Sequence, residues 1–254
     1  MSESTVELTD ALVVDGVRIG RYRLRDQPVT AELFKVEVST ADAADAVVAS
    51  MGGWALTTTD PSLVDELLAR GAMATRRYSL MSLPLDAPAA TAADGLGLRD
   101  LATVPLTVDT EVTPGVVDLI RQAYPAGHPD QETGSDDDVE RAMHRILEGE
   151  WLGPLHPASR LVMDGERPVA MIILNRPEGS APVGGLWLSE ICRAPDAAYS
   201  GLGADLLLAV LAECRQAGEH ALSLAVTDGN PARRMYQRLG FVTAMSITKL
   251  LIPG

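Results

Sequence analysis

The sequence predicts an α/β fold, in which apolar strands alternate with helices along the chain. Residues 186–192 form a short apolar run of the kind found in buried strands. Gly201 and Gly203 then open a segment with apolar residues at helical spacing. A second apolar strand, residues 221–226, leads to Asn230, which stands where the N-cap of another helix belongs. Strands and helices therefore alternate through the C-terminal part of the chain.

The N-terminal third alternates in the same way, with more polar strands. Gly16 separates two short β patterns, which indicates a hairpin. Ser39 or Thr40 can cap the first helix, and Gly71 ends the second. The expected strands are residues 11–14, 17–24, 33–38, 54–58 and 72–84, and the expected helices are residues 41–50 and 61–69.

A segment rich in Ala, Pro and Gly, residues 85–100, is expected to be a linker. After it, Thr113 and Pro114 can start a helix, and Ser135 can cap the next one. A polar, glycine-bearing loop, residues 124–135, joins these two helices. The expected elements of this region are strands at residues 103–108, 159–163 and 168–174, and helices at residues 114–123 and 136–147.

The turn at Gly201 and Gly203 has the features of an anion site. Without side chains at these positions, backbone N–H groups can approach a phosphate closely. The N-terminus of the following helix adds roughly half a positive charge. Because ordinary structural turns share this Gly-x-Gly spacing, the turn alone leaves both interpretations open.

The order of motifs in the second half resembles the GCN5-related N-acetyltransferase (GNAT) superfamily. The resemblance covers residues 101–254 and rests on the glycine turn, Asn230, Tyr236 and the Gly240-Phe241 pair. It implies a mixed, largely antiparallel central sheet flanked by helices, with acetyl-coenzyme A as the acyl donor. The implied coenzyme-binding residues are Ile191, Cys192 and Arg193 at the pantetheine arm, Tyr199, Ser200, Gly201, Leu202, Gly203 and Ala204 around the pyrophosphate, and Asn230.

Two positions depart from the family pattern. The family turn usually carries Gln or Arg three residues before its first glycine and a basic residue directly before it. Ala198 and Ser200 stand at these positions. Since a hydrogen bond to a charged group contributes about 1.5–3 kcal/mol, we expect weaker binding of coenzyme A, with the backbone amides still in place.

The resemblance also implies catalytic roles for two side chains. Tyr236 would protonate the departing thiolate, because a phenol is a proton donor at neutral pH; packing beside Met235 is the alternative role. Glu190 matches an acid often found in the central strand of the family and can accept the amine proton through water. Anchoring a cationic substrate is the alternative for Glu190. Ala225 stands where some members carry a base.

A covalent acyl-cysteine mechanism at Cys192 and catalytic roles for the histidines have less support than the roles of Tyr236 and Glu190. No histidine is positioned by sequence to activate Cys192, and buried thiols are commonly inert. His128, in the loop 124–135, can touch a substrate or lie in solvent. The other three histidines have no metal-ligand spacing, so no metal site is expected. Arg233, Arg234 and Arg238 either meet a coenzyme phosphate or form a solvated helix face.

The N-terminal third is interpreted as a degenerate half-copy of the same fold. The strand at residues 54–58, the Pro61 helix, Gly71 and the strand ending at Pro84 repeat the order found in residues 221–253. Asn230 and Tyr236 have no counterparts there, so this copy is expected to carry no chemistry; chance similarity is the alternative. The expected division is a half-GNAT unit at residues 1–84, the linker at 85–100 and an acyltransferase domain at 101–254.

Composition limits the partners. The 254 residues are 46% hydrophobic, which is enough for one large core or two modest ones. The net charge of −14 argues against nucleic acid and opposes an anionic coenzyme at long range. The polar, acidic start of the chain and the absence of a long apolar run predict neither a signal peptide nor a membrane span. The two cysteines make no disulfide framework. A cytoplasmic protein is expected, as a monomer or a homodimer.

These observations predict an acetyl-coenzyme A-dependent N-acyltransferase. We expect direct transfer of an acetyl or short acyl group to a primary amine of a small molecule or an amino terminus. The alternative is a catalytically weak or inactive GNAT-fold module that binds acyl-coenzyme A or a protein partner. The replaced residues in the glycine turn and the degenerate first copy keep that alternative open.

Overall fold

A computed structural model describes residues 8–26, 29–86, 101–179, 181–182 and 184–254 of the chain. The chain forms two compact units. The first comprises Met1–Leu80 and Thr243–Gly254, and the second comprises Met81–Val242. Because strands β5 (Met73–Pro84) and β11 (Val242–Leu251) cross these bounds, each has residues in both units.

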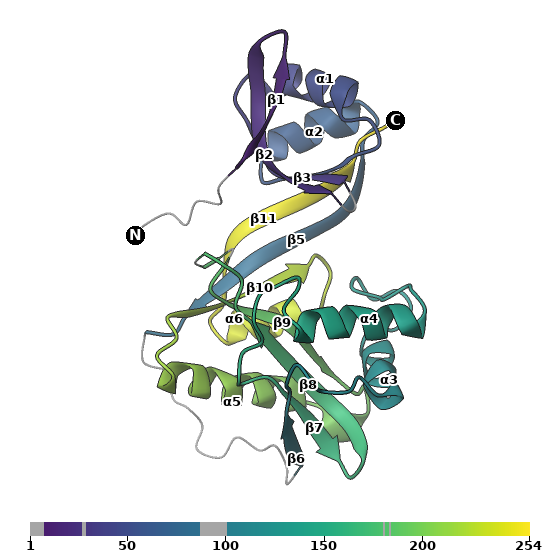
Figure 1. The fold of residues 1–254 in the computed structure, drawn as a ribbon, viewed down its shortest axis with the longest axis vertical. Coiled ribbons are helices and arrows are strands. Elements are labelled where there is room, and N and C mark those ends of the chain that lie inside the picture. Colours follow the sequence, from purple (N-terminus) through teal and green to yellow (C-terminus); the bar gives the residue numbers. More distant parts are fainter. Residues whose placement is uncertain (1–7, 27–28, 87–100, 180, 183) are drawn as a thin grey trace. The chain divides into compact units, whose positions relative to one another are not determined.

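The first unit is a sheet covered by two helices (Figure 1). Its strand order is β1-β2-β3-β4-β11-β5, and the described pairs from β1 to β11 are antiparallel except for the parallel pair β3–β4. The core includes Phe34, Leu56, Leu63, Leu67 and Leu250, each at most 2% exposed. The remaining elements of the unit are β1 (Asp10–Val14), β2 (Val17–Asp26), β3 (Val29–Val36), α1 (Thr40–Ser50), β4 (Ala55–Thr58) and α2 (Pro61–Ala69).

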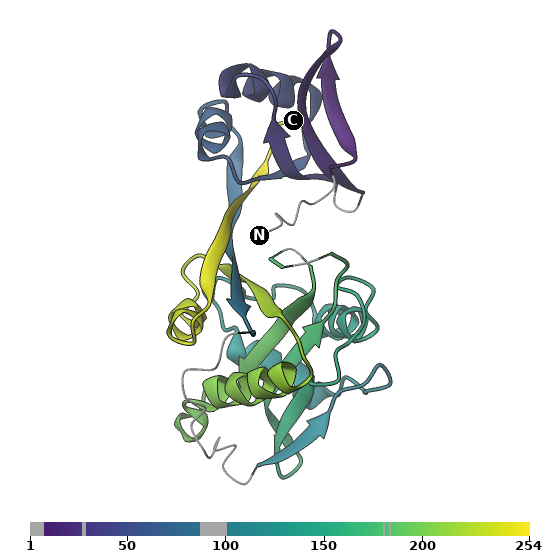
Figure 2. The same cartoon turned by 90° about the vertical axis from the view of Figure 1, so that its left-hand side faces the viewer.

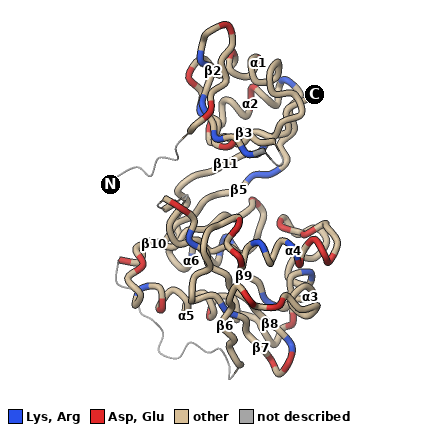
Figure 3. The backbone as a smooth tube through the Cα atoms, viewed as in Figure 1, with Lys and Arg blue, Asp and Glu red and all other residues tan. Residues whose placement is uncertain are grey.

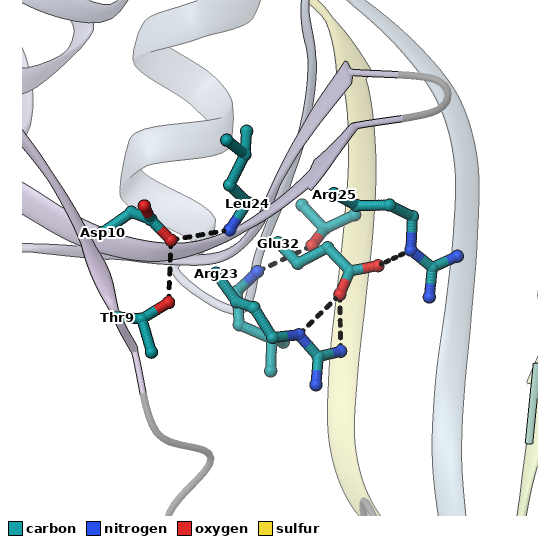
Figure 4. Close-up of polar contacts among 8 residues, drawn as sticks. Thr9, Asp10, Arg23, Leu24, Arg25 and Glu32 are labelled. Carbon is teal, nitrogen blue, oxygen red and sulfur yellow. Dashed lines mark hydrogen bonds and ion pairs between the residues drawn. The ribbon is translucent and has the colours of Figure 1, made fainter. Parts of the chain in front are cut away.

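Polar contacts join the outer strands of the first unit (Figure 4). Asp10 Oδ2 accepts a hydrogen bond from the Leu24 backbone N–H at 3.1 Å. Glu32 on β3 pairs with two arginines of β2, at 2.9 Å from Arg23 Nε and 3.0 Å from Arg25 Nε. The arginine side chains are more than half exposed, so each pair contributes only about 0–1 kcal/mol.

The second unit is a sheet with helices on both sides. Strands follow the order β10-β9-β8-β7-β6, with the end of β5 beside β10. All described pairs are antiparallel except β9–β10. Helices α3 and α5 lie on opposite sides of β8 and β9 (Figures 1 and 2). The elements are β6 (Ala102–Pro105), α3 (Pro114–Ala123), α4 (Asp136–Leu147), β7 (Arg160–Asp164), β8 (Arg167–Asn175), β9 (Leu186–Arg193), η1 (Ala197–Tyr199), α5 (Leu202–Gln216), β10 (Ala221–Thr227) and α6 (Ala232–Arg238).

Local signals explain where most helices begin. Asp60 accepts hydrogen bonds from the N–H groups of Ser62 and Leu63 at the start of α2. Ser135 and Asp138 form a capping box at the start of α4. Because these signals lie within a few residues of the helix that they start, α2, α3 and α4 have the bounds that the sequence predicts.

The α/β prediction, with a mixed and largely antiparallel sheet flanked by helices, is confirmed. Differences lie at element ends. The strand expected at residues 103–108 is Ala102–Pro105, and the one expected at 33–38 is Val29–Val36. In each case the pairing with a neighbouring strand sets the limits, which local sequence does not carry. Residues 87–100 of the expected linker lie outside the described residues.

The C-terminal residues group differently from the expected division of the chain. Residues 243–254 belong with the first unit, because β11 pairs with β4 from Thr248–Thr58 to Leu251–Ala55. Leu250 and Ile252 are buried in the core of that unit. A half-copy and a catalytic domain, as functional units, stay predictions.

One segment, Ala197–Gln216, is long and apolar enough to span a membrane by length and composition alone. It contains α5, whose buried side chains in the core of the second unit are Leu202, Leu206, Leu207, Val210, Leu211 and Cys214. A helix in the core of a protein meets the same criteria of length and composition, so these criteria alone do not identify a membrane span.

Candidate active site

The candidate site forms where two parallel strands separate. The described pairs of β9 with β10 run from Leu186–Leu222 to Leu188–Leu224, although both strands continue beyond them. In the β8–β9 ladder a register shift leaves Ser189 as an extra residue directly before Glu190. The separation therefore gives the end of β9 an edge without a neighbouring strand on the β10 side.

Glu190 lies at this edge, and the residue as a whole is partly buried. The hydroxyl of Tyr124, the C-cap residue of α3, donates a hydrogen bond to Glu190 Oε1 and lies 3.1 Å from the Ile191 carbonyl oxygen. Burial raises the pKa of Glu190 to about 7. Hydrogen bonds from Tyr124 and the Ile191 N–H act against this rise, and the charges of Glu132 and Asp130 add to it. A carboxyl group that titrates near neutral pH can accept and release protons.

Tyr236 lies on α6 and is 6% exposed. Its ring packs against Phe241, with the ring centroids 5.7 Å apart. Burial raises the pKa of the phenol, and the negative charges of Glu190 and Asp130 raise it further. These charges act on Tyr236 because the two carboxylates lie in the same part of the unit. The phenol is protonated at neutral pH.

The loop 124–135, here called the acceptor loop, is joined to the turn between β10 and α6. Asp130 Oδ1 accepts a hydrogen bond from the Thr227 hydroxyl, and Asp130 Oδ2 accepts one from Asn230 Nδ2 at 2.7 Å. Asn230 Oδ1 in turn accepts from the Ala232 N–H at 2.7 Å. The Asn230 side chain therefore bonds the first N–H of α6, but the N-cap residue of the helix is Pro231, one residue later than the sequence predicts, and regular helix begins at Ala232.

The glycine turn presents the N-terminus of α5. Gly201 has a φ of 88°, a conformation that favours glycine, and no side chain caps the helix. A Cβ atom added at Gly203 would meet nothing within 4 Å. The Leu202 side chain is buried in the core, so only its backbone faces the turn. The N-terminus of α5 and the space beside Gly203 fit an anionic group.

Other predicted residues around this turn have protein partners. Tyr199 is 9% exposed and donates a hydrogen bond to Asp164 Oδ2 at 2.7 Å. Its phenol therefore anchors the turn to β7. Ser200 is exposed, and Ala204 is partly buried in the first turn of α5, with its N–H donating to the Gly201 carbonyl oxygen at 2.9 Å.

Cys192 and Arg193 follow Glu190 on β9. Cys192 is 6% exposed, and burial raises the pKa of its thiol well above the usual value. A thiol with a raised pKa is a poor nucleophile, so this environment gives no support to an acyl-cysteine route. The Arg193 guanidinium donates to the Ala194 carbonyl oxygen at 2.6 Å. A contact of either residue with pantetheine stays a prediction.

The structure brings Glu190, Tyr236 and Asn230 into one unit with the glycine turn. Sequence reasoning missed Tyr124 and Asp130. Tyr124 lies 66 positions before Glu190, and Asp130 lies 100 positions before Asn230. No local pattern joins residues so far apart in sequence. Polar and aromatic residues concentrated in the loop were the only available signal.

A shallow depression of about 580 Å³ is lined by Pro231, Arg234, Gln237 and Arg238 on and before α6. Its two arginines can bind phosphate groups. Among the described side chains, no group of three or more His, Cys, Asp or Glu residues is arranged to hold a metal ion.

Comparisons with known proteins identify a similar family and fold. The profile of the acetyltransferase (GNAT) family matches residues 115–241. A GCN5-related N-acetyltransferase from Sphaerobacter thermophilus aligns with a TM-score of 0.58 and 12% identity, covering 94% of this chain and 79% of that one. A GNAT-family acetyltransferase from Colwellia psychrerythraea aligns with a TM-score of 0.58 and 10% identity, covering 95% and 84%. A tandem GNAT protein from the clavulanic acid biosynthesis pathway aligns with a TM-score of 0.50 and 14% identity, covering 94% and 80%. No curated protein sequence matches the chain.

Proposed function

Because the chain belongs to the GNAT acetyltransferase family, we propose that it transfers an acetyl or short acyl group from acyl-coenzyme A to a primary amine. The acceptor is a small molecule or an amino terminus, and transfer is direct, within a ternary complex. One observation carries the proposal: a glycine turn at an uncapped helix end stands in the same unit as a protonated tyrosine and a carboxyl group titrating near pH 7.

The residues of the second unit fit the coenzyme. Backbone N–H groups of Gly201, Leu202 and Gly203 would hold the pyrophosphate, since the helix end carries about half a positive charge and Gly203 leaves the space open. Ile191, Cys192 and Arg193 would lie along the pantetheine arm at the free edge of β9. The depression at Arg234 and Arg238 is available to a further phosphate.

Acyl-coenzyme A, when bound, supplies the activated acyl group. Glu190 acts as the base, directly or through a water molecule, because a carboxylate with a pKa of about 7 can take a proton from an ammonium group. Tyr124 holds Oε1 of this carboxylate, which fixes the position of the base relative to the acceptor.

Tyr236 acts as the acid, and protonation of Glu190 prepares it for this role. The negative charge of Glu190 contributes to the raised pKa of the Tyr236 phenol. When Glu190 takes the amine proton, that charge disappears, and the pKa of Tyr236 falls. Proton uptake by the base therefore makes the acid stronger at the step at which the thiolate leaves.

The acidic surroundings favour a cationic acceptor. Acceptor-loop residue Glu132 acts electrostatically on Glu190. Asp136, Asp137 and Asp138 lie in the first turn of α4, where Figure 3 shows acidic residues together. A cytoplasmic location and a monomeric or homodimeric state belong to the same proposal.

The second candidate function is a module that binds acyl-coenzyme A, or a protein partner, without turnover. Ala198 and Ser200 favour it, because neither supplies the charged hydrogen bond of the family turn. Asp205, in the first turn of α5, adds a negative charge close to where the pyrophosphate would lie.

The test combines calorimetry with acetyl-coenzyme A and thiol release with a panel of primary amines. We expect binding by the natural chain and none by Gly203→Asp, because the added carboxylate repels the pyrophosphate. The new side chain meets no protein atom within 4 Å of its Cβ position, so folding should be kept. Equal affinity of both proteins would refute the coenzyme site. Binding without thiol release from any amine would favour the second candidate.

A further inference from the structure

The contacts of Asp130 connect two parts of the candidate site. Both of its carboxylate oxygens accept hydrogen bonds from the β10–α6 turn, from Thr227 and from Asn230. Its own backbone N–H donates to His128 Nδ1 at 3.1 Å. A charged acceptor with a donor at each oxygen holds its partners firmly, since such hydrogen bonds are about twice as strong as neutral ones.

On the acceptor side, Asp130 stands in a loop with its own internal hydrogen bonds. The His128 N–H donates to the Pro125 carbonyl oxygen at 2.9 Å, and the Gln131 N–H donates to the His128 carbonyl oxygen at 3.0 Å. The His128 ring packs against Tyr124, with centroids 5.1 Å apart. Through Tyr124 the loop reaches Glu190.

Asp130 is also connected to α6, the helix that carries Tyr236, through Asn230. Asn230 donates one hydrogen bond to Asp130 and accepts another from the first turn of α6. Gly229, in the same turn, lies against Pro129: a Cβ atom added there would be 3.5 Å from Pro129 Cγ. The turn and the loop are therefore joined by the two hydrogen bonds to the Asp130 carboxylate and by the packing of Gly229 against Pro129.

From this arrangement, and on the basis of the proposed function, we propose that Asp130 is a positioning residue. It anchors the acceptor loop to the start of α6 and thereby fixes the acceptor amine between Glu190 and Tyr236. The loop supplies one wall of the acceptor site, and α6 supplies the acid. A wall that moves by about 1 Å relative to the acid can cost about a hundredfold in rate.

The charge of Asp130 has a second, separable effect. The groups that act on the pKa of Glu190 are Tyr124 at the end of α3, the Ile191 N–H on β9, and Asp130 and Glu132 in the acceptor loop. The charge of Glu190 acts in turn on Tyr124, on Cys192 of β9 and on Tyr236 of α6. Asp130 raises the pKa of both Glu190 and Tyr236. Removing only its charge should lower both pKa values without moving the loop.

Three substitutions separate geometry from charge. Asp130→Ala removes both hydrogen bonds and the charge. Asp130→Asn removes the charge, but its oxygen can accept from Asn230 and its amide can donate to the Thr227 hydroxyl. Thr227→Val keeps the charge and removes one hydrogen bond. Asp118→Ala, which removes an exposed acid from α3, is the matched control.

The first measurement is hydrogen–deuterium exchange of the acceptor loop in the free protein. We expect exchange at least tenfold faster in Asp130→Ala, a smaller increase in Thr227→Val, and rates within about twofold of the natural chain in Asp130→Asn and Asp118→Ala. Unchanged loop exchange in both Asp130→Ala and Thr227→Val would overturn the proposal. If Asp130→Ala does not fold, the exchange rate of the acceptor loop in Thr227→Val decides the test, and an unchanged rate in that variant would overturn the proposal.

The second measurement is kinetic. Asp130→Ala should raise the KM for the amine at least tenfold, while the Kd for coenzyme A changes less than threefold. Asp130→Asn should keep that KM and move the acidic limb of the kcat/KM profile to lower pH. If Asp130 only stabilised the fold, Asp130→Ala would lower stability without raising the KM for the amine more than the Kd for coenzyme A. That result would overturn the proposal. Hydrogen–deuterium exchange requires no substrate, so it tests the anchoring of the loop even if the natural chain shows no turnover. Absence of turnover would refute the proposed enzyme function and leave the anchoring by Asp130 to be decided by exchange.

Discussion

At Glu190, several neighbours act on one carboxyl group in opposite directions. Burial raises its pKa to about 7, while the hydrogen bond from Tyr124 holds that value down. A base must be deprotonated to accept a proton, so its pKa sets the acidic limb of the activity profile. In the proposed role of Glu190 as the base, this local balance would determine where in the neutral range activity begins.

Substitution of Tyr124 should shift this limb upward. Tyr124→Phe keeps the ring beside His128 and removes the hydroxyl that stabilises the Glu190 carboxylate. The pKa of Glu190 then rises, and the acidic limb of the kcat/KM profile should move from near pH 7 to higher pH by roughly one unit, a tenfold loss at pH 6. Asp130→Asn should move it in the opposite direction. Shifts of the same sign in the two variants would contradict the role given to Glu190.

Tyr236 is the residue that tests the acid step. Tyr236→Phe keeps the contact with Phe241 and removes only the hydroxyl. Loss of a general acid typically lowers the rate about 10²–10⁴-fold, and coenzyme affinity should change little because the packing is kept. Single-turnover thiol release measures the rate, and calorimetry measures the affinity. An unchanged chemical step would leave a water molecule as the acid, and loss of both binding and stability would identify a structural tyrosine.

At the scale of elements, the two units differ at the start of the helix that follows the parallel-pairing strand. In the first unit Ser39 caps α1, and Asp42 in its first turn accepts a hydrogen bond from the Ser39 hydroxyl. In the second unit Gly201 leaves the start of α5 without a side-chain cap. Both helices carry an acid in the first turn, Asp42 in α1 and Asp205 in α5, so the difference lies in the cap: the start of α5 keeps its N–H groups open to an anion, whereas Ser39 already bonds one N–H of α1.

The strand pairs differ in a related way. In the first unit β3 and β4 pair at Thr30–Ala55 and Ala31–Leu56, and threonine side chains fill the next positions. Thr57 Oγ1 accepts from the Leu33 N–H at 2.8 Å, and Thr58 Oγ1 donates to the Phe34 carbonyl oxygen at 2.9 Å. The position equivalent to the free edge of β9 is thus closed. This supports the prediction that the first unit binds no coenzyme.

The turn before α5 can be strengthened. Ser200→Arg places a basic side chain directly before Gly201, at an exposed position. A charged hydrogen bond to the pyrophosphate should raise the affinity for coenzyme A about tenfold, which equals about 1.4 kcal/mol. Calorimetry on Ser200→Arg, with Ser200→Gln as the uncharged control, checks this. Equal gains from arginine and glutamine, or no gain from either, would show that the pyrophosphate does not lie at this turn.

Elements with local signals could be predicted from the sequence, and contacts between distant residues could not. Pro61 and Ser135 mark helix starts because caps act within one turn of the backbone. The glycine turn and Asn230 could be recognised for the same reason. Tyr124 and Asp130 find their partners only through the fold, since loop residues carry no periodicity that points to a strand or turn far along the chain.

At the scale of the whole molecule, the units do not follow the order of the chain. The sequence repeat predicts a boundary after Pro84 and groups the last residues with the second part. Instead β11 pairs with β4, and Leu250 and Ile252 complete the core of the first unit. Strand-helix-strand repeats identify equivalent segments, but they do not tell which copy of the last strand completes which sheet.

This strand assignment predicts how fragments of the chain behave. Residues 1–84 alone lack β11, so β4 loses a neighbouring strand and the core loses two fully buried side chains, each at most 1% exposed. Losing one such leucine typically costs about 2.7–5 kcal/mol, which is a large part of the stability of a small unit. We expect no cooperative thermal transition from this fragment by circular dichroism.

Joining residues 242–254 after residue 84 through a glycine-serine linker should restore that transition, because the linker supplies β11 in the same molecule. The same linked chain with Leu250→Ala is the matched control, and it should melt at a clearly lower temperature, since the substitution leaves a cavity in the core. Cooperative melting of residues 1–84 without the added strand would mean that β11 is dispensable to the first unit. Failure of the linked chain to fold, with or without Leu250, would mean that β5 and β11 need the second unit to hold their pairing.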